Sequence, residues 1–279
     1  MVGFALVVLA ALSFCSSTEC SVLLRRQQRT HLTKFSGNRE YMQAFPLEKY
    51  QIYTVPQQGK FYIDTTCDCI KGVLARGEPW ESEIDGVIAQ YTKSRTVALD
   101  IGAHIGTHTL GLSRAVGADG VVIAFEPNPK IYRELCMNLT LNGCTNVIPV
   151  QCALGDHDGQ IGILTNIYQN EGSSYVGAGN QIVELRKLDD FGIRNISFIK
   201  MDVENYEDMV LIVGSRTIAA SRPIIFLEIQ GNVEQRAAFG GDGKIKTAAT
   251  ISLLKKMGYD AARFDGVDYL ATPVGHSGS

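Results

Sequence analysis

The sequence predicts an α/β fold built on a doubly wound, mostly parallel sheet. Three observations lead to this prediction. Short β-branched runs alternate with segments of helical periodicity along most of the 279 residues. The apolar runs are nearly continuous, as in strands that are buried on both faces. A composition with 45% hydrophobic and 20% charged residues suits a globular protein with a well-filled core.

The first 60 residues are expected to lie outside the main domain. Residues 1–20 are apolar and then small and polar, which fits a signal peptide; extended to residue 24, the stretch fits a short membrane anchor. Either role places the protein in the secretory pathway or on a membrane. The alternative is a buried or disordered extension of a cytoplasmic protein. Residues 21–60 are polar and mixed, so we expect a linker or an N-terminal cover, and the α/β domain then covers residues 61–275.

The α/β domain is predicted to open with a helix around Ile84, Val87 and Ile88. Trp80 stands just before this helix, either as a packing anchor or as a lip of the binding cleft. Further helices are predicted over 106–117, 129–143 and 246–259, and strands over 96–101, 120–126, 146–154, 159–165, 181–188, 196–204 and 222–230. A loop is expected over 166–180, and a closing hairpin over 259–273 adds an antiparallel edge strand.

Acidic side chains stand at the carboxyl ends of several predicted strands. Ligands of doubly wound sheets bind outside these ends. A row of like charges on one rim opposes folding, so we interpret the row as a ligand site rather than as a stabilising feature. Its members are Asp100, Glu126, Asp202, Glu204 and Glu228.

The turn after the first of these strands has the pattern D-x-G-x-x-x-G, formed by Asp100, Gly102 and Gly106. It is neither the G-x-G-x-x-G turn of nicotinamide proteins nor the lysine-containing loop that binds nucleotide phosphates. Glu126 follows about 20 residues later, at the spacing where an acid binds ribose hydroxyls in dinucleotide folds. A ligand with a ribose, no phosphate and a cationic centre suits this rim. S-adenosylmethionine has these features.

Five segments, in this order, resemble the FkbM family of S-adenosylmethionine-dependent methyltransferases. They are ALDIGAHIGTHTL, AFEPNP, CALGD, FIKMDVENYE and IFLEI, and the resemblance covers about residues 78–272. GEPWE at Gly77–Glu81 also resembles the segment that precedes the first strand in that family. The resemblance implies a Rossmann-like class I methyltransferase fold and S-adenosylmethionine as cofactor. It also implies O-methylation of a hydroxyl on a carbohydrate or small metabolite.

Matching positions carry over the cofactor-binding residues of the family. His104 departs from the pattern, because Asn is commoner there, and Asn205 replaces a usual Gly. Neither departure removes a cofactor ligand. Cys152 and Asp156 belong to the segment on the adenine side. The resemblance implies cofactor contacts by Asp100, Gly102, Ala103, His104, Gly106, Glu126, Pro127, Asn128, Ala153, Leu154 and Asp202.

Three side chains are candidates for the base that helps a hydroxyl to attack the methyl group. They are Asp202, Glu204 and His104. Asp202 and Glu204 alternatively stabilise the start of a helix near residue 205, and His104 alternatively only shapes the turn. His108 is expected to pack in the core.

Contacts to the acceptor are expected from Glu228 and from Ser173 and Ser174, although the two serines equally fit a flexible polar turn. Glu228 and Asp202 alternatively hold magnesium, but the preferred site contains no metal. We expect a small-molecule or glycan acceptor, and residues 1–24 allow association with a membrane. The formal net charge of −3 gives no reason to expect nucleic acid.

Two rival functions remain open from the sequence. A module that binds S-adenosylmethionine without transferring its methyl group would keep the same cofactor residues. A nicotinamide oxidoreductase would use a similar sheet, but the missing G-x-G-x-x-G turn argues against it.

Overall fold

The computed structural model describes residues 46–64, 68–166, 170–177, 179, 181–204, 206–229 and 243–275, and it describes no side chains over 165–178 and 243–246. The predicted signal or anchor segment at residues 1–24 lies outside the described residues. No helix in the described part of the chain is long and apolar enough to cross a membrane.

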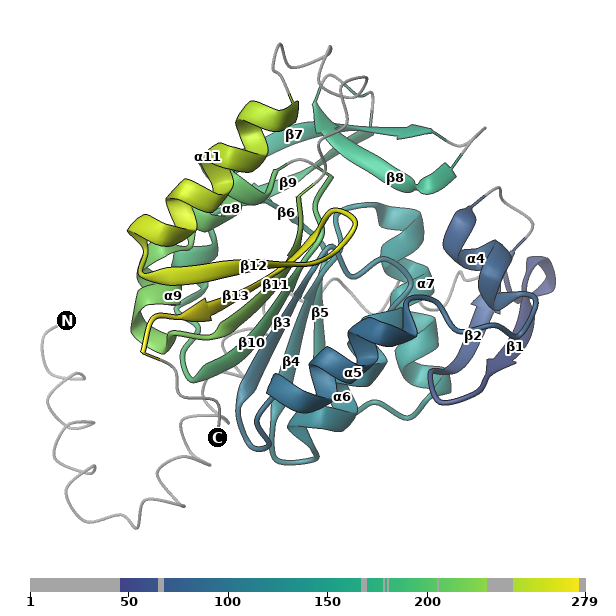
Figure 1. Ribbon diagram of the computed structural model, residues 1–279. Coiled ribbons are helices and arrows are strands. Elements are labelled where there is room, and N and C mark those ends of the chain that lie inside the picture. Colours follow the sequence, from purple (N-terminus) through teal and green to yellow (C-terminus); the bar gives the residue numbers. More distant parts are fainter. Residues whose placement is uncertain are drawn as a thin grey trace, which may run out of the picture.

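A seven-stranded sheet forms the centre of the molecule (Figure 1). Its strand order is β12-β13-β11-β10-β3-β4-β5, and the strands from β5 to β11 are parallel. The chain runs outward from β3 to β5 and then returns to β10 on the other side of β3. The carboxyl ends of β3 and β10 therefore flank the switch point where doubly wound sheets bind ligands. The strands are β3 (Val97–Ile101), β4 (Val121–Phe125), β5 (Val147–Val150), β10 (Ile196–Met201), β11 (Ile224–Glu228), β12 (Tyr259–Asp265) and β13 (Asp268–Pro273).

The predicted closing hairpin is present as β12 and β13. The antiparallel strand β13 lies between β11 and β12, so β12 is the edge strand. Because two reversals cancel, β12 runs in the same direction as β11. The pairing of Glu228 with Asp268 brings Asp268 to the carboxyl end of β11.

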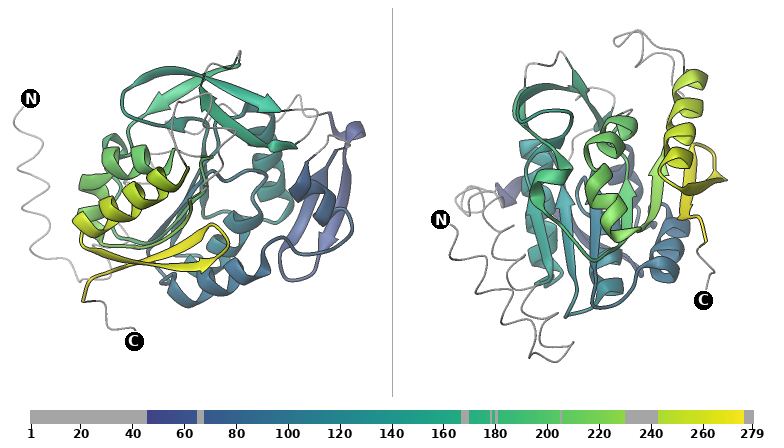
Figure 2. Two further views of the ribbon diagram at one scale, coloured as in Figure 1. Left: turned by 45° about the horizontal axis from the view of Figure 1, so that its top comes forward. Right: turned by 90° about the vertical axis from the view of Figure 1, so that its left-hand side faces the viewer.

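Helices cover both faces of the central sheet (Figure 2). Alternate strand residues point to opposite faces, so Ala98 packs with Ile88 and Leu112 on one face, and Leu99 packs with Leu254 on the other. Both faces are buried, which explains the continuous apolar runs. The first face carries α5 (Ser82–Tyr91), α6 (Thr107–Val116) and α7 (Pro129–Leu141), and the second carries η2 (Leu188–Phe191), α8 (Glu207–Val213), α9 (Ser215–Ser221) and α11 (Gly243–Lys256).

Helix α7 begins where its sequence predicts. Asn128 is the N-cap, and its Oδ1 accepts hydrogen bonds from the backbone N–H of Lys130 at 3.0 Å and of Ile131 at 3.4 Å. Pro129 follows as the first helical residue, where its missing N–H costs no hydrogen bond. These two residues fix the direction of the chain directly after Glu126.

A second, four-stranded sheet lies beyond the carboxyl ends of the central strands (Figure 1). The loop predicted over 166–180 is wrong, because β8 occupies most of it and pairs with β7. The single strand predicted over 146–154 is also wrong, because β5 ends at Val150 and β6 joins the second sheet. Pairing with β7 overrides the weak strand propensity of Gly, Ser and Asn in β8. The strands are β6 (Ala153–Leu154), β7 (Gly159–Asn166), β8 (Asn170–Gly177) and β9 (Gln181–Arg186).

An N-terminal cover, residues 46–64 and 68–76, packs beside α7 (Figure 1). Its β1–β2 hairpin includes residues 51–60, which belong to the segment expected to be a linker or an N-terminal cover. Asn138 of α7 and Asn142, the C-cap of this helix, hold the hairpin. Asn142 accepts from the Lys60 N–H at 2.9 Å, and Asn138 accepts from the Tyr62 N–H at 2.7 Å. The cover consists of η1 (Leu47–Lys49), β1 (Gln51–Val55), β2 (Gly59–Ile63) and α4 (Cys69–Leu74).

Candidate active site

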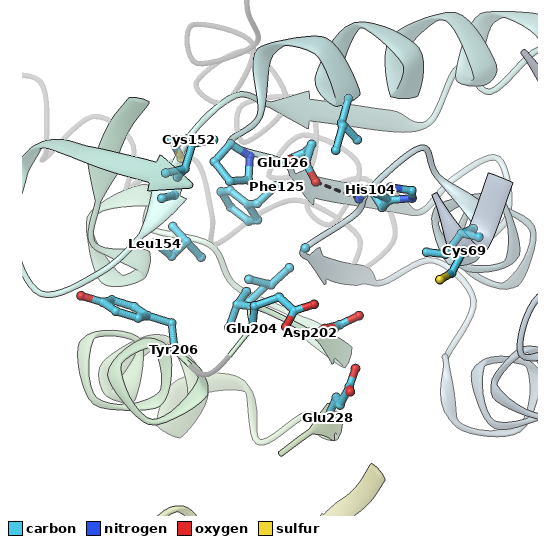
Figure 3. Close-up of a pocket in the computed structure, with 18 of the residues that line it drawn as sticks. Cys69, His104, Phe125, Glu126, Cys152, Leu154, Asp202, Glu204, Tyr206 and Glu228 are labelled. Atoms are coloured by element: carbon cyan, nitrogen blue, oxygen red, sulfur yellow. Dashed lines mark hydrogen bonds between the residues drawn. The ribbon is translucent and has the colours of Figure 1, made fainter. Parts of the chain in front are cut away.

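A cavity opens at the carboxyl ends of the central strands, between the second sheet and the N-terminal cover (Figure 3). It lies at the switch point beside β3 and β10. Most of the predicted site residues line it. These are Gly102, His104, Glu126, Pro127, Ala153, Leu154, Asp202, Glu204 and Glu228.

Four predicted cofactor residues, Asp100, Ala103, Gly106 and Asn128, are not among the lining residues. Asp100 is 0% exposed, and its Oδ2 accepts a hydrogen bond from Thr109 Oγ1 at 2.6 Å. Burial raises the pKa of this carboxyl group. The Asp100 side chain therefore lies inside the protein and outside the cavity lining, and its predicted contact with the cofactor stays a prediction.

The glycine turn packs directly against the end of β10. Gly102 has φ of +84°, and a Cβ there would overlap the carbonyl oxygen of Asp202. The N–H groups of Gly102 and Ala103 both donate to the Phe125 carbonyl, at 3.0 and 2.9 Å. The turn therefore fits between the ends of β4 and β10 only without a side chain.

Glu126 faces the cavity from the end of β4 and is fixed by two backbone donors (Figure 3). Its Oε1 accepts from the Asn128 N–H at 2.8 Å, and its Oε2 accepts from the His104 N–H at 3.0 Å. Burial raises the pKa of Glu126 to about 7, although the charge of His104 and these hydrogen bonds oppose the rise. The carboxylate is thus held in one orientation, with lone pairs left for ligand hydroxyls.

Lys200 is a residue of the site that the sequence analysis missed. Its Nζ donates to the Gly102 carbonyl at 3.1 Å and lies 3.3 Å from Asp202 Oδ2, while its backbone pairs with Asp100 across the strands. Burial lowers the pKa of Lys200, but the charges of Asp202 and Asp100 outweigh burial and raise it. A lysine within an apolar strand, two residues before an acid, was the signal that could have revealed it.

Asp202, Glu204 and Glu228 meet on the opposite side of the cavity from Glu126 and His104 (Figure 3). Burial raises the pKa of Asp202, but the Lys200 charge and a hydrogen bond with Glu228 outweigh it and lower the pKa overall. Asp202 is therefore ionised at neutral pH. Among the described residues, no group of three His, Cys, Asp or Glu side chains is arranged to hold a metal ion.

Trp80 and His108 also lie at the site. Trp80 packs against an apolar cluster and lines the cavity, so it is both a packing anchor and a lip of the cleft. His108 is buried in α6, as expected, but its Nε2 lies 3.1 Å from Glu81, another lining residue. The side chains of Ser173 and Ser174 are outside the described part of the structure, so their predicted contact with an acceptor stays a prediction.

The lining fits the parts of S-adenosylmethionine that the sequence predicts. The Glu126 carboxylate is suited to accept hydrogen bonds from ribose hydroxyls, and Phe125, Ile131 and Leu154 form apolar surface that is suited to an adenine ring. Asp202 and Glu204 place negative charge where a sulfonium is favoured. Gly102 lines the cavity with backbone atoms alone.

Comparisons with known proteins give the family of the chain. The family model described as "Methyltransferase FkbM domain" matches residues 100–261. A search of curated proteins finds no match to this chain. Three solved structures illustrate the similarity in fold. The FkbM methyltransferase from Methylobacillus flagellatus is 15% identical, with a TM-score of 0.44 over 72% of this chain and 65% of that chain.

The other two structures are a precorrin-6y C5,15-methyltransferase from Geobacter metallireducens and a fibrillarin from Aeropyrum pernix. The first is 15% identical, with a TM-score of 0.42 over 68% of this chain and 85% of that chain. The second, solved with natively bound S-adenosylmethionine, is 10% identical, with a TM-score of 0.43 over 83% and 85%. The family match, rather than these distant structures, carries the assignment. Because it spans more than half of the 279 residues, the chain belongs to the FkbM methyltransferase family and is an S-adenosylmethionine-dependent methyltransferase.

Proposed function

We propose that this protein methylates a hydroxyl oxygen of a carbohydrate or small metabolite. The observation that carries the proposal is the group of carboxylates, Asp202, Glu204 and Glu228, on one side of the cavity. Carboxylates accept hydrogen bonds from hydroxyl groups, and they repel substrates that carry negative charge. Such a wall suits an acceptor that is rich in hydroxyl groups and carries no negative charge.

S-adenosylmethionine supplies a methyl group already activated by its positive sulfur. The protein's part is therefore chiefly to place an acceptor oxygen in line with that methyl group. In the proposed role, Glu126 fixes the ribose, while the apolar surface around Leu154 excludes water from the adenine side.

Asp202 is the best candidate for the catalytic base. Its ionised carboxylate would take up the proton of the attacking hydroxyl group, and bound S-adenosylmethionine would supply the methyl group. His104 is less suited, because its Nε2 already lies 3.1 Å from Asp68 Oδ2. Glu204 lies beside Asp202 in the lining and is assigned to holding the acceptor.

Asp202→Asn is expected to lower kcat by about 10²–10⁴-fold, the usual contribution of a positioned base. The Kd for S-adenosylmethionine should change much less, because the amide keeps its size and one acceptor oxygen. Single-turnover methyl transfer and calorimetric titration separate the two effects. Asp260→Asn, an exposed acid on β12, is the matched control and should behave as the unchanged protein. Equal kcat values for D202N and the unchanged protein would exclude Asp202 as the base.

An acceptor screen tests the function itself. Neutral sugars, amino sugars, uronic acids and small phenols are incubated with labelled S-adenosylmethionine, and products are identified by mass spectrometry. The proposal expects a methyl ether on a neutral hydroxyl acceptor. Methylation of only nitrogen or carbon atoms would contradict it. Tight cofactor binding with no transfer to any acceptor would instead favour the inactive binding module.

The raised pKa of Glu126 predicts that cofactor binding depends on pH. The carboxylate is mostly protonated at pH 6 and ionised at pH 8, because burial raises its pKa to about 7. The ionised form accepts ribose hydroxyls more strongly, so we expect up to about tenfold tighter binding of S-adenosylmethionine at pH 8. Titrations at the two pH values measure the change, and Glu126→Gln should remove it. An unchanged pH dependence in E126Q would assign the effect to another group.

The raised pKa of Glu126 affects the stability of the cofactor-free protein in the opposite direction: stability falls as pH rises. A carboxyl group whose folded pKa is raised stabilises the fold only while it is protonated. This contribution is present below about pH 4.5 and is lost as pH rises through about 7. Bound cofactor should therefore raise Tm more at pH 8 than at pH 6.

A further inference from the structure

Part of the cofactor site comes from outside the segment that matches the family. The family match begins at residue 100, whereas Cys69 and Ile70 of α4 also line the cavity. Helix α4 lies beside the β1–β2 hairpin, and it approaches β8 of the second sheet (Figure 1). The N-terminal cover thus forms one wall of the site.

Asp68 connects this wall to the glycine turn. Its Oδ1 accepts a hydrogen bond from the Lys71 N–H at 2.9 Å and so begins α4, while its Oδ2 lies 3.1 Å from Nε2 of His104. The Asp68 side chain is 0% exposed and that of His104 is 11% exposed. His104 Nδ1 has no hydrogen-bond partner among the described residues, so Asp68 is the one described side chain that orients the imidazole through a hydrogen bond.

His104 contacts both Asp68 and Glu126. Its ring lies beside Asp68, and its backbone N–H donates a hydrogen bond to Glu126 Oε2 at 3.0 Å. His104 also has φ of +49°, a conformation that most side chains avoid, so the turn needs external support to hold it. A displacement of Asp68 would therefore shift His104 and, with it, the Glu126 carboxylate that is assigned to the ribose.

A buried group of charges fixes the other side of α4. Lys71 is 1% exposed, and its Nζ lies 3.0 Å from Asp64 Oδ1 and 2.8 Å from Glu134 Oε2. Tyr50 donates a hydrogen bond to Glu134 at 2.7 Å, and Lys130 lies 2.7 Å from Asp64. These contacts tie the cover to α7, so α4 is held between two sets of buried ionic contacts.

We propose that Asp68 is a positioning residue for S-adenosylmethionine, acting through His104 on the glycine turn and on Glu126. The N-terminal cover is then part of the cofactor site, and cofactor binding and docking of α4 stabilise each other. The inference concerns binding of the cofactor and does not depend on the identity of the acceptor.

A double-mutant cycle on the full chain tests this coupling. Asp68→Asn keeps an N-cap acceptor for α4, and His104→Asn tolerates the positive φ; both remove the ionic contact. Each variant should raise the Kd for S-adenosylmethionine about tenfold, and the double variant should bind no more weakly than the weaker single variant. In the unchanged protein, the cofactor should also slow hydrogen exchange of the α4 amides, and it should do so much less in D68N and H104N.

An exposed ion pair beside α4 supplies the control. Arg76 and Glu78 lie 2.9 Å apart, with both side chains 57% exposed, so R76Q and E78Q should leave the Kd unchanged. H104N leaves the side chains of the cover intact, so it tests the contact even where D68N lowers Tm. Binding by D68N and H104N as tight as in the unchanged protein would overturn the proposal. The proposal would also be overturned if the free-energy losses of cofactor binding in D68N and H104N added fully in the double variant. The same holds if the rise in Kd followed only the fall in Tm.

Discussion

Gly102→Ala is expected to abolish binding of S-adenosylmethionine and to destabilise the fold by more than about 4 kcal/mol. The added Cβ would overlap the Asp202 carbonyl oxygen, which belongs to the backbone and cannot rotate away. The positive φ of +84° adds about 1–2 kcal/mol of strain. Relief requires the turn and the end of β10 to separate, which displaces both Glu126 and Asp202 from the cavity. Urea unfolding and calorimetric titration measure the two effects.

Gly143→Ala separates the clash from the strain. Gly143 follows α7 with φ of +66°, and a Cβ there would meet nothing within 4 Å. We expect a loss of about 1 kcal/mol and unchanged cofactor binding. Similar losses of stability in G102A and G143A would show that the close approach of the glycine turn to β10 is not a constraint on the site.

Lys200→Met is expected to cost about 3–5 kcal/mol of stability, because it leaves the buried Asp100 and the half-buried Asp202 without their cation. Lys200 is 5% exposed, lies 3.3 Å from Asp202 and pairs with Asp100 on the neighbouring strand. Without the Lys200 charge, Asp100 and Asp202 repel each other, and the pKa of Asp202 should rise. A larger fraction of Asp202 is then protonated at neutral pH and cannot act as a base. The free energy of unfolding from urea titrations and the pH profile of methyl transfer report the two consequences.

A second substitution tests the cause of this loss. Asp100→Asn added to K200M removes the uncompensated charge while keeping an oxygen for Thr109, so it should restore part of the stability. Lys60→Met, an exposed lysine on β2, should change the free energy of unfolding by less than about 0.5 kcal/mol. If D100N fails to improve K200M, lost packing rather than charge is the reason for the destabilisation.

The central sheet and the rim of acids could be predicted because both depend on local patterns. Continuous apolar runs mark strands buried on both faces, and the acids that end them meet at one edge of a parallel sheet. Asn128 and Pro129 announce the start of α7 in the same local way. In the second sheet, β7 and β9 were predicted as strands, whereas β8 was not, because its residues have weak strand propensity and depend on pairing with β7.

The surroundings of Asp100 and the contacts of His104 could not be predicted from the sequence. A spacing motif places Asp100 near the cofactor, but it cannot show that Thr109 and Lys200 surround the carboxylate within the protein. Asp68 lies 36 residues before His104, in a segment that no sequence pattern links to the site. Contacts of this kind depend on how the N-terminal cover packs, which no short pattern encodes.

The most direct test of the account is calorimetric titration of the full chain with S-adenosylmethionine, beside Glu126→Ala and with NAD as the competing cofactor. The account predicts micromolar binding of S-adenosylmethionine, a loss of at least about 100-fold in E126A, and no binding of NAD. Circular dichroism should show that both proteins are folded. Equal affinity of folded E126A and the unchanged protein, or no binding of S-adenosylmethionine by the folded chain, would contradict the assignment of this cavity as the cofactor site.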